Sequence, residues 1–262
     1  MLARKELPPA FVEWNAEWRA PFGPEWGYDI PIEQRFNSQR ARQLGPFAFQ
    51  PNNTTRRVEY PWAFQALDIK PGSDVVDIGG ALSGFQFVLD RCGANVTNVD
   101  PFHDCWWSSF YPAEPELQHA RLNRYFETGV ILKRANLAEA GLDDESFDQA
   151  VCLSTIEHLA DDEITRTIQE VCRILRNGAL FVLTVDLFLN LFPFTRRRRN
   201  KCGTNVSIQN VVEQSNMRLV CGERKELFGF PEFDPKRILS NLKDYYIGAD
   251  YPALAQMFVL RK

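Results

Sequence analysis

The chain has 262 residues, of which 45% are hydrophobic and 24% charged, as in an ordinary globular protein with one sizeable domain. Its formal net charge of −4 disfavours a general nucleic-acid-binding protein, which usually carries a basic surplus, so no nucleic-acid partner is predicted. The 6 cysteines form no CxxC pair, and no apolar run has the length of a membrane span or the form of a signal peptide. We therefore predict no metal site and a cytoplasmic location.

Residues 1–58 are rich in proline and aromatic side chains, which favours short helices and loops rather than strands. Trp14 and Trp18 are four apart, so they would share one face of a helix. Two interpretations of this segment stay open. It is either a wrap that covers one side of the main domain, or a lid whose aromatic side chains and Arg35, Arg40 or Arg42 help to enclose a substrate.

A glycine-rich turn organises the rest of the chain. The sequence VVDIGGALSGF at residues 75–85 is an apolar run that ends in Asp77, followed by the turn and by a helical pattern. From Phe85 onward, apolar residues recur at i, i+3, i+4 and i+7, so this helix has one apolar face. A strand, a tight glycine turn and a helix bring backbone N–H groups close to a ligand at the carboxyl end of the strand.

Further strands and helices alternate along the chain, which predicts an α/β, Rossmann-like, doubly wound and mostly parallel seven-stranded sheet. A helix that begins near Asp161 is expected to end at Asn177 and Gly178. The last two strands are expected to pair antiparallel at the edge of the sheet. The predicted strands after the first are residues 95–99, 130–135, 147–153, 179–185, 217–223 and 255–260, and the predicted helices include 59–69, 117–126 and 206–214.

Three polar residues fall at predicted strand ends: Asp77, Asp100 and Asn136. Asp100 suits the ribose hydroxyls of a nucleotide and Asn136 an adenine edge, although each would also serve as a turn or loop cap. A nicotinamide dinucleotide calls for GxGxxG, which this turn matches imperfectly, and Asp77 would lie badly near a pyrophosphate. A cationic ligand with an amino-acid tail suits that carboxylate, which favours S-adenosylmethionine (SAM).

Five segments in this order resemble class I SAM-dependent methyltransferases of the group related to ubiquinone and menaquinone methyltransferases. They are VVDIGGA at 75–81, VD at 99–100, SFDQAVC at 146–152, STIEHL at 154–159, and the helix that ends in RNG at 164–178. The resemblance implies a methyltransferase with SAM as cofactor. It implies that these residues bind SAM: Asp77, Gly79, Gly80, Ala81, Asp100, Pro101, Asn136, Leu137 and Ser154.

The chain departs from the family pattern in the glycine turn. Ala81 and Ser83 stand where the family usually has glycine, and Ala81 would be strained at a positive φ, so we expect a reshaped loop. The segment RNGA replaces the usual proline–glycine pair, which we expect to affect only a turn. A dinucleotide-dependent oxidoreductase, NAD(P) being its cofactor, and a SAM-fold binding protein without catalysis stay open as alternatives.

His158 is the candidate general base, because its imidazole follows the fourth strand and would face the transfer site. It would otherwise shape the pocket together with Glu157. His103 is a second candidate, with a surface loop as its other interpretation, and His119 is expected to be exposed.

The domain boundaries follow from the resemblance: a cap at residues 1–58 and a methyltransferase domain at 59–262. Within the domain, 70–186 holds the core motifs and 187–262 shapes the acceptor pocket. The expected acceptor is a small-molecule or glycan-type compound methylated on oxygen, and nitrogen and carbon acceptors stay open as alternatives. The basic run from Arg196 to Arg199, with Lys201, would bind an anionic group on the acceptor or a membrane surface, or would merely be solvated. Arg196 and Arg197 are the candidate acceptor contacts in this run. Trp106 and Tyr60 are further candidate acceptor contacts. Nothing in the sequence assigns an oligomeric state.

Overall fold

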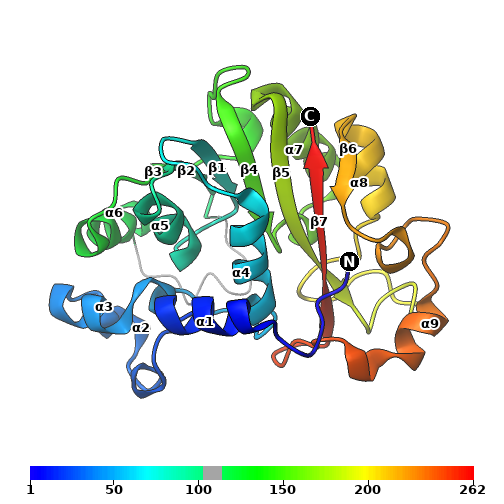
Figure 1. The fold of residues 1–262 in the computed structure, drawn as a ribbon, viewed down its shortest axis with the longest axis horizontal. Coiled ribbons are helices and arrows are strands. Elements are labelled where there is room, and N and C mark those ends of the chain that lie inside the picture. Colours follow the sequence, from blue (N-terminus) through cyan, green and yellow to red (C-terminus); the bar gives the residue numbers. More distant parts are fainter. Residues whose placement is uncertain (103–113) are drawn as a thin grey trace.

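The structure is a computed structural model that describes residues 1–102 and 114–262. One sheet forms the centre of the molecule, and its described strands have the order β3-β2-β1-β4-β5-β7-β6 (Figure 1). Their bounds are β1 (Asp74–Ile78), β2 (Asn95–Val99), β3 (Ile131–Lys133), β4 (Phe147–Leu153), β5 (Leu175–Phe188), β6 (Arg218–Cys221) and β7 (Ala253–Arg261).

The first five strands are parallel, and β7 runs antiparallel to both of its neighbours, β5 and β6. The predicted fold class is therefore confirmed. The antiparallel C-terminal strand lies one position inside the edge formed by β6. Side chains that alternate along the strands enter two different hydrophobic cores, as the period of two requires: Val75 and Val151 lie on one face, Val76 and Ala150 on the other.

Helices cover both faces of the sheet. The first core includes side chains of α4 (Arg56–Leu67), α5 (Gly84–Arg91) and α6 (Pro115–Phe126), and the second includes those of α7 (Asp161–Ile174) and α8 (Ile208–Ser215). Short helices fill the connections: α9 (Pro235–Ser240), η4 (Leu137–Glu139), η5 (Ile156–His158), η6 (Arg224–Glu226) and η7 (Leu242–Asp244).

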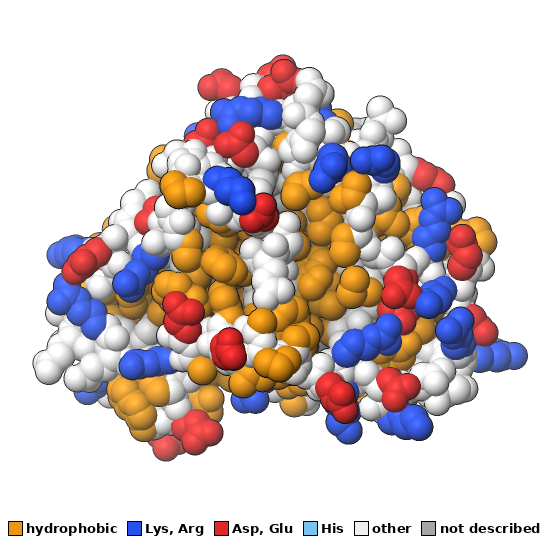
Figure 2. Space-filling model, in the orientation of Figure 1, with side chains coloured by type: hydrophobic (Ala, Val, Ile, Leu, Met, Phe, Trp, Pro, Cys, Tyr) orange, Lys and Arg blue, Asp and Glu red, His pale blue; other side chains and the backbone are white. Residues whose placement is uncertain are grey.

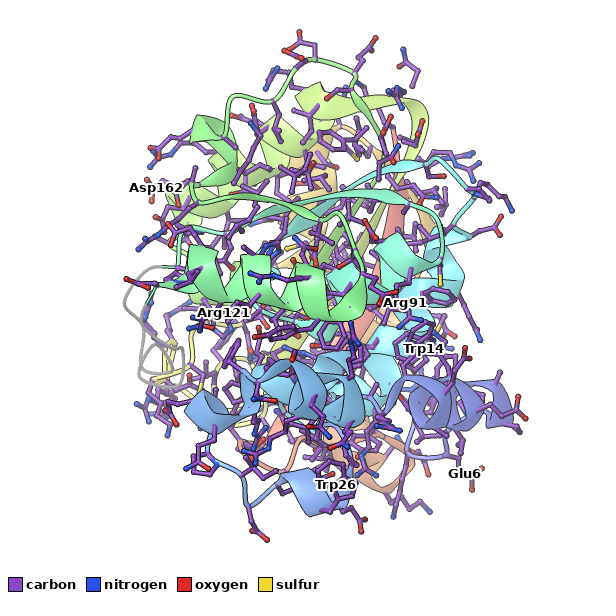
Figure 3. All side chains as sticks on the ribbon, turned by 90° about the vertical axis from the view of Figure 1, so that its left-hand side faces the viewer. Glu6, Trp14, Trp26, Arg91, Arg121 and Asp162 are labelled. Carbon is purple, nitrogen blue, oxygen red and sulfur yellow. The ribbon has the colours of Figure 1, made fainter. Side chains whose placement is uncertain are left out.

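The N-terminal segment forms short helices, as predicted: α1 (Pro9–Trp18), η1 (Glu25–Gly27), α2 (Ile32–Arg35), α3 (Ser38–Leu44) and η2 (Pro46–Phe49). Helix α3 lies beside α6, whereas α1 packs against α4, with Trp14 on the side of α1 that faces the main domain (Figure 3). The Trp14 ring lies 5.8 Å from that of Phe47 and 6.4 Å from that of Phe85. Because these helices cover its outer side, α5 is buried on more than the one face predicted.

Several predicted boundaries are shifted, most of all in β5, which spans Leu175–Phe188 instead of residues 179–185. Helix α4 begins at Arg56 instead of residue 59, and α7 ends at Ile174 instead of Asn177. The chain enters β5 at once, because Leu175 pairs with Phe147 of β4. Arg176 then lies between the carboxylates of Asp74 and Asp148, at 3.1 and 2.6 Å. The segment RNGA is thus part of a strand and not a turn.

Hydrophobic side chains gather across the middle of the face seen in Figure 2, and charged side chains are more frequent toward its rim. Within residues 1–102 and 114–262, no helix is long and apolar enough to cross a membrane.

Candidate active site

A cavity of about 1290 Å³ lies where β1, β2 and β4 end. Its walls come from the glycine turn, the start of α4, the segment after β4, the N-terminal segment and the loops around residues 200 and 250. The structure thus brings together most of the predicted site residues that it describes: Asp77, Gly79, Gly80, Ala81, Asp100, Pro101, Ser154, His158 and Tyr60. His103 and Trp106 lie outside the described residues.

Two glycines of the turn leave no room for a side chain. Gly79 has φ 73°, and a Cβ there would lie 2.2 Å from the methyl carbon of Thr155. A Cβ on Gly80 would lie 2.5 Å from Oδ2 of Asp77. The backbone of the turn therefore passes closely between the ends of β1 and β4, as a ligand-cradling loop requires.

Ala81 has a positive φ of 43°, as the predicted reshaping of the loop requires. Its carbonyl accepts hydrogen bonds from Asn98 Nδ2 at 2.8 Å and Gln86 Nε2 at 3.0 Å, and its N–H donates to Asp100 Oδ2 at 3.0 Å. These bonds hold the strained conformation. His119 Nε2 lies 2.8 Å from Gln86 Oε1, so His119 supports this network.

The prediction that His119 is exposed is wrong. Its side chain is only 3% exposed, and burial lowers its pKa to about 4, so the imidazole is neutral at pH 7. The polar network around Gln86 compensates for placing it in the core, which the weak periodicity of α6 did not reveal.

The last glycine of the turn, Gly84, stands one residue later than in the family pattern, and its surroundings leave no room for a side chain. A Cβ at Gly84 would lie 2.7 Å from the backbone carbon of Pro46. The N-terminal segment is thus pressed against the start of α5. Gln50 Oε1 also accepts from Leu82 N at 3.0 Å, and Tyr60 OH lies 3.2 Å from Ser83 Oγ. The turn is therefore held partly by residues outside the core motifs.

Two carboxylates lie below and beside the turn. Burial, with Asp100 as a second cause, raises the pKa of Asp77 to about 7. Asp100 accepts from the backbone N–H groups of Ala81 and of Phe102, the latter at 2.7 Å. Within residues 1–102 and 114–262, no cationic side chain contributes to the pKa of the buried Asp77. This carboxylate therefore fits a cationic ligand, and SAM carries an amino group and a sulfonium. The residues present therefore fit SAM.

Asn136 and Leu137 are placed differently. Asn136 precedes η4 and donates to Glu139 Oε2 at 3.3 Å, whereas Leu137 is buried in the second core beside Ile78 and Val99. Neither belongs to the described cavity wall.

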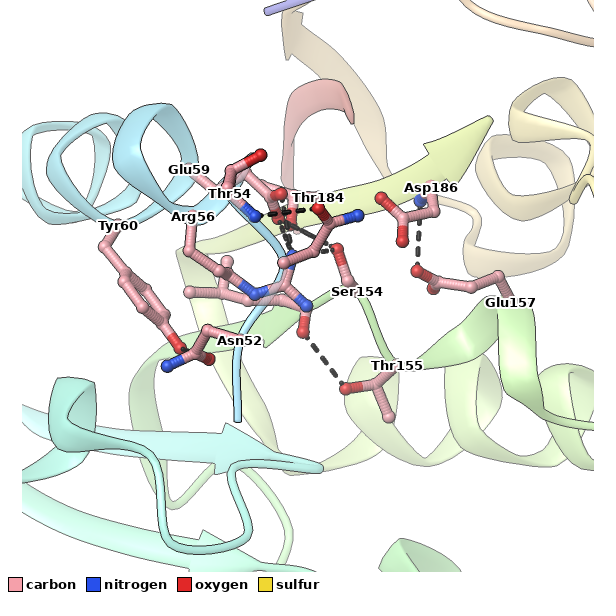
Figure 4. A network of polar contacts seen from close by, with 12 residues as sticks. Asn52, Thr54, Arg56, Glu59, Tyr60, Ser154, Thr155, Glu157, Thr184 and Asp186 are labelled. Carbon is pink, nitrogen blue, oxygen red and sulfur yellow. Dashed lines mark hydrogen bonds and ion pairs between the residues drawn. The ribbon is translucent and has the colours of Figure 1, made fainter. Parts of the chain in front are cut away.

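A buried ion pair forms the other side of the cavity (Figure 4). Arg56 Nη1 lies 2.7 Å from Glu59 Oε1, with side-chain exposures of 11% and 0%. Burial favours the neutral form of Glu59, but Arg56 and the hydroxyls of Thr184 and Ser154 outweigh it and lower its pKa. Ser154 Oγ joins both partners, because it accepts from Arg56 at 2.7 Å and donates to Glu59 at 2.8 Å. Helix α4, β4 and β5 meet at this pair.

Two further carboxyl groups are fully buried next to this pair, Glu157 and Asp186. Glu157 Oε1 accepts from the backbone N–H of Asp186 at 3.0 Å, and Asp186 Oδ2 accepts from the hydroxyl of Tyr251 at 2.8 Å. Burial raises the pKa of each carboxyl group to about 8. The charge of Glu59 contributes to both shifts, and that of Glu157 contributes to the shift of Asp186.

His158 lines the cavity, and its Nδ1 forms a hydrogen bond with the carbonyl of Cys202. Burial lowers its pKa, against the opposing effect of hydrogen bonds to the backbone of Cys202 and Ser154. The basic run after residue 195 contributes Arg199 and Lys201 to the described wall, rather than Arg196 and Arg197.

Arg56, Glu59, Asp186 and Tyr251, of which Glu59 and Asp186 are fully buried, were missed from sequence. Asp186 had a usable signal: an acid within the apolar strand around Val185 and Leu187 must be paired or neutral when it is buried. Nothing comparable marks Tyr251, whose role depends on a contact 65 residues away in the chain.

The fold is shared with SAM-dependent methyltransferases. One from Methanosarcina mazei is 18% identical, with a TM-score of 0.52 over 76% of this chain and 96% of that chain. One from Mesorhizobium loti is also 18% identical, with a TM-score of 0.54 over 78% and 97%. The [4+2]-cyclase SpnF is 12% identical, with a TM-score of 0.57 over 93% and 97%. At these identities the likeness shows the fold, which is that of the class I enzymes.

The sequence comparison points to the same class. A family model described as "Methyltransferase domain" matches residues 76–183. A search of curated proteins found no match. The predicted resemblance to class I SAM-dependent methyltransferases and the predicted cofactor of that class, SAM, are thereby confirmed.

Proposed function

We propose that this protein transfers a methyl group from SAM to a hydroxyl oxygen of a small-molecule or glycan-type acceptor. One observation carries the proposal: a single cavity joins the glycine turn and its carboxylates to a second set of polar groups at the ends of β4 and α4. The first set, with Asp77 and Asp100, suits the cationic donor. The second, with Arg56, Ser154 and Tyr251, leaves room for an acceptor beside it. Positioning the acceptor in line supplies much of the rate of such a transfer.

The N-terminal segment 1–58 acts as a cap on the acceptor side, and residues 187–262 shape the opposite wall. Phe22, Tyr28 and Ile30 face the cavity from the cap, while Cys202 and Tyr251 face it from the C-terminal region. These aromatic and apolar walls favour an acceptor with a flat or hydrophobic part. Arg199 and Lys201 in the cavity wall are placed to bind an anionic group on that acceptor.

Calorimetry with SAM, its demethylated product and NAD tests the donor. We expect binding of SAM and of the product, whereas binding of NAD alone would contradict the proposal and favour the oxidoreductase alternative. One protein of this fold is a [4+2]-cyclase, so the fold alone does not establish methyl transfer. A screen of acceptors must therefore detect the mass increase of a methyl group on the product. Tight SAM binding without such a product on any acceptor would favour a binding protein without catalysis.

A further inference from the structure

Tyr251 connects the cavity to a carboxyl group that does not itself line it. The tyrosine lies in the loop before β7, where its side chain forms part of the cavity wall. Its hydroxyl donates to Asp186 Oδ2 at 2.8 Å, and Asp186 is fully buried on β5. A proton that leaves a molecule in the cavity therefore has a hydrogen-bonded path through Tyr251 to Asp186.

The surroundings of Asp186 favour the binding of a proton by its carboxyl group. Glu157 on η5 and Glu59 on α4 are the nearby acids, and Arg56 on α4 is the nearby cation. The other titratable neighbours among the described residues are His158, Cys202 and Tyr251. Arg56 is already paired with Glu59. Among the described residues, Asp186 Oδ1 and Glu157 Oε2 have no hydrogen-bond partner. Two adjacent carboxylates in a dry interior repel each other, so the pair holds a proton more readily than an exposed acid does.

We propose that Tyr251 and Asp186 form a proton relay that deprotonates a hydroxyl group of the acceptor. The inference rests on the proposed methyl transfer and narrows its acceptors to phenols and alcohols. The acceptor hydroxyl donates to the oxygen of Tyr251. As its proton passes to that oxygen, the proton of Tyr251 passes to Asp186, which becomes a neutral carboxylic acid.

The methyl transfer and the return of the proton complete the reaction. SAM supplies the methyl group: the acceptor oxygen bonds to the methyl carbon as the carbon–sulfur bond breaks, and the electron pair of that bond stays on sulfur. Asp186 later returns its proton through Tyr251 to solvent. His158, the base predicted from sequence, is the competing route, but its ring is engaged with the backbone of Cys202 and Ser154.

The test uses the full chain, SAM, and three hydroxyl probes: catechol, 4-nitrophenol and methyl glucoside. With the probe that wild type methylates, Tyr251→Phe should lower the rate about 100-fold or more while SAM affinity by calorimetry stays unchanged, because general base catalysis contributes that much. Asp186→Asn should abolish the rise of the wild-type rate with pH through about 8, where the Asp186 carboxyl ionises. The control Tyr246→Phe, in the same loop but outside the described cavity wall, should behave as wild type.

The relay is overturned if Tyr251→Phe keeps the wild-type rate and pH profile, or if His158→Gln alone removes the pH dependence. It is also overturned if SAM binds tightly and none of the three probes is methylated. Failure to bind SAM would instead contradict the proposed function. In case Asp186→Asn does not fold, the Asp186 carboxyl is followed by 13C NMR in wild type: ionisation above pH 7 supports the relay, and ionisation below pH 5 refutes it.

Discussion

The two ends of the cavity are built on different physical principles. At the glycine turn, backbone groups form the wall, and side chains such as Asp100, Asn98 and Gln86 hold them through hydrogen bonds. These residues lie within about one strand–turn–helix–strand unit. At the opposite end, polar and charged side chains form the wall, and they come from places far apart in the chain: Arg56 and Tyr251 both lie close to Asp186. The first end is a local structure, whereas the second exists only when the whole sheet is assembled.

The buried ion pair should give the largest effect on stability. Arg56→Met leaves the carboxylate of Glu59 buried without its cation, and breaking such a pair costs about 3–5 kcal/mol of unfolding free energy. Chemical denaturation at pH 7 measures this cost. Arg166→Met, which removes an exposed pair with Asp162, is the matched control and should change stability by less than about 1 kcal/mol. Equal effects of the two substitutions would show that the acceptor end does not depend on the buried pair.

This difference determines how far the sequence could predict the molecule. The strand that ends near Asp77, the glycine turn and the acid at Asp100 were found because their spacing follows from one local motif. Strand β4 was predicted with its observed bounds, since the apolar stretch at residues 150–153 and Phe147 mark it. The contacts of Gly84 with Pro46 and of Tyr251 with Asp186 were not predictable, because no periodicity links residues that meet only through tertiary packing.

Substitution of Asp100 tests the end of the cavity that the glycine turn forms. Asp100→Ala should weaken SAM binding at least about tenfold, because a hydrogen bond to a charged group is worth about 1.5–3 kcal/mol. Its carboxylate also holds the N–H of Ala81, so both direct contact and loop order are lost. Calorimetry with SAM measures the change, and the exposed Asp68→Ala serves as control. An unchanged dissociation constant would exclude Asp100 from the donor site.

Substitution of Gly84 tests whether the N-terminal cap supports the glycine turn. Gly84→Ala forces a methyl group against the backbone of Pro46, and overpacking of this kind costs about 1–3 kcal/mol. At Gly129 a Cβ would meet only Asp90 Oδ2 at an ordinary 3.8 Å, so Gly129→Ala should stay within about 0.5 kcal/mol of wild type. Denaturation and SAM binding are measured on both variants. If Gly84→Ala weakens SAM binding as well as stability, the cap and the turn act as one unit.

Substitution of Ala81 should have the smallest effect on stability, and it compares this turn directly with the glycine of the family pattern. Glycine adopts a positive φ without the strain of about 1–2 kcal/mol that an L side chain carries, but it loses more conformational entropy on folding. Ala81→Gly should therefore stabilise the protein by about 1 kcal/mol or less, as measured by denaturation. Ala138→Gly, at an exposed site on η4 without a positive φ, should destabilise it slightly. Because the bonds from Asn98 and Gln86 go to the carbonyl of residue 81, they survive the substitution, and SAM affinity should be unchanged. A loss of affinity in Ala81→Gly would mean that the methyl group itself contacts the donor.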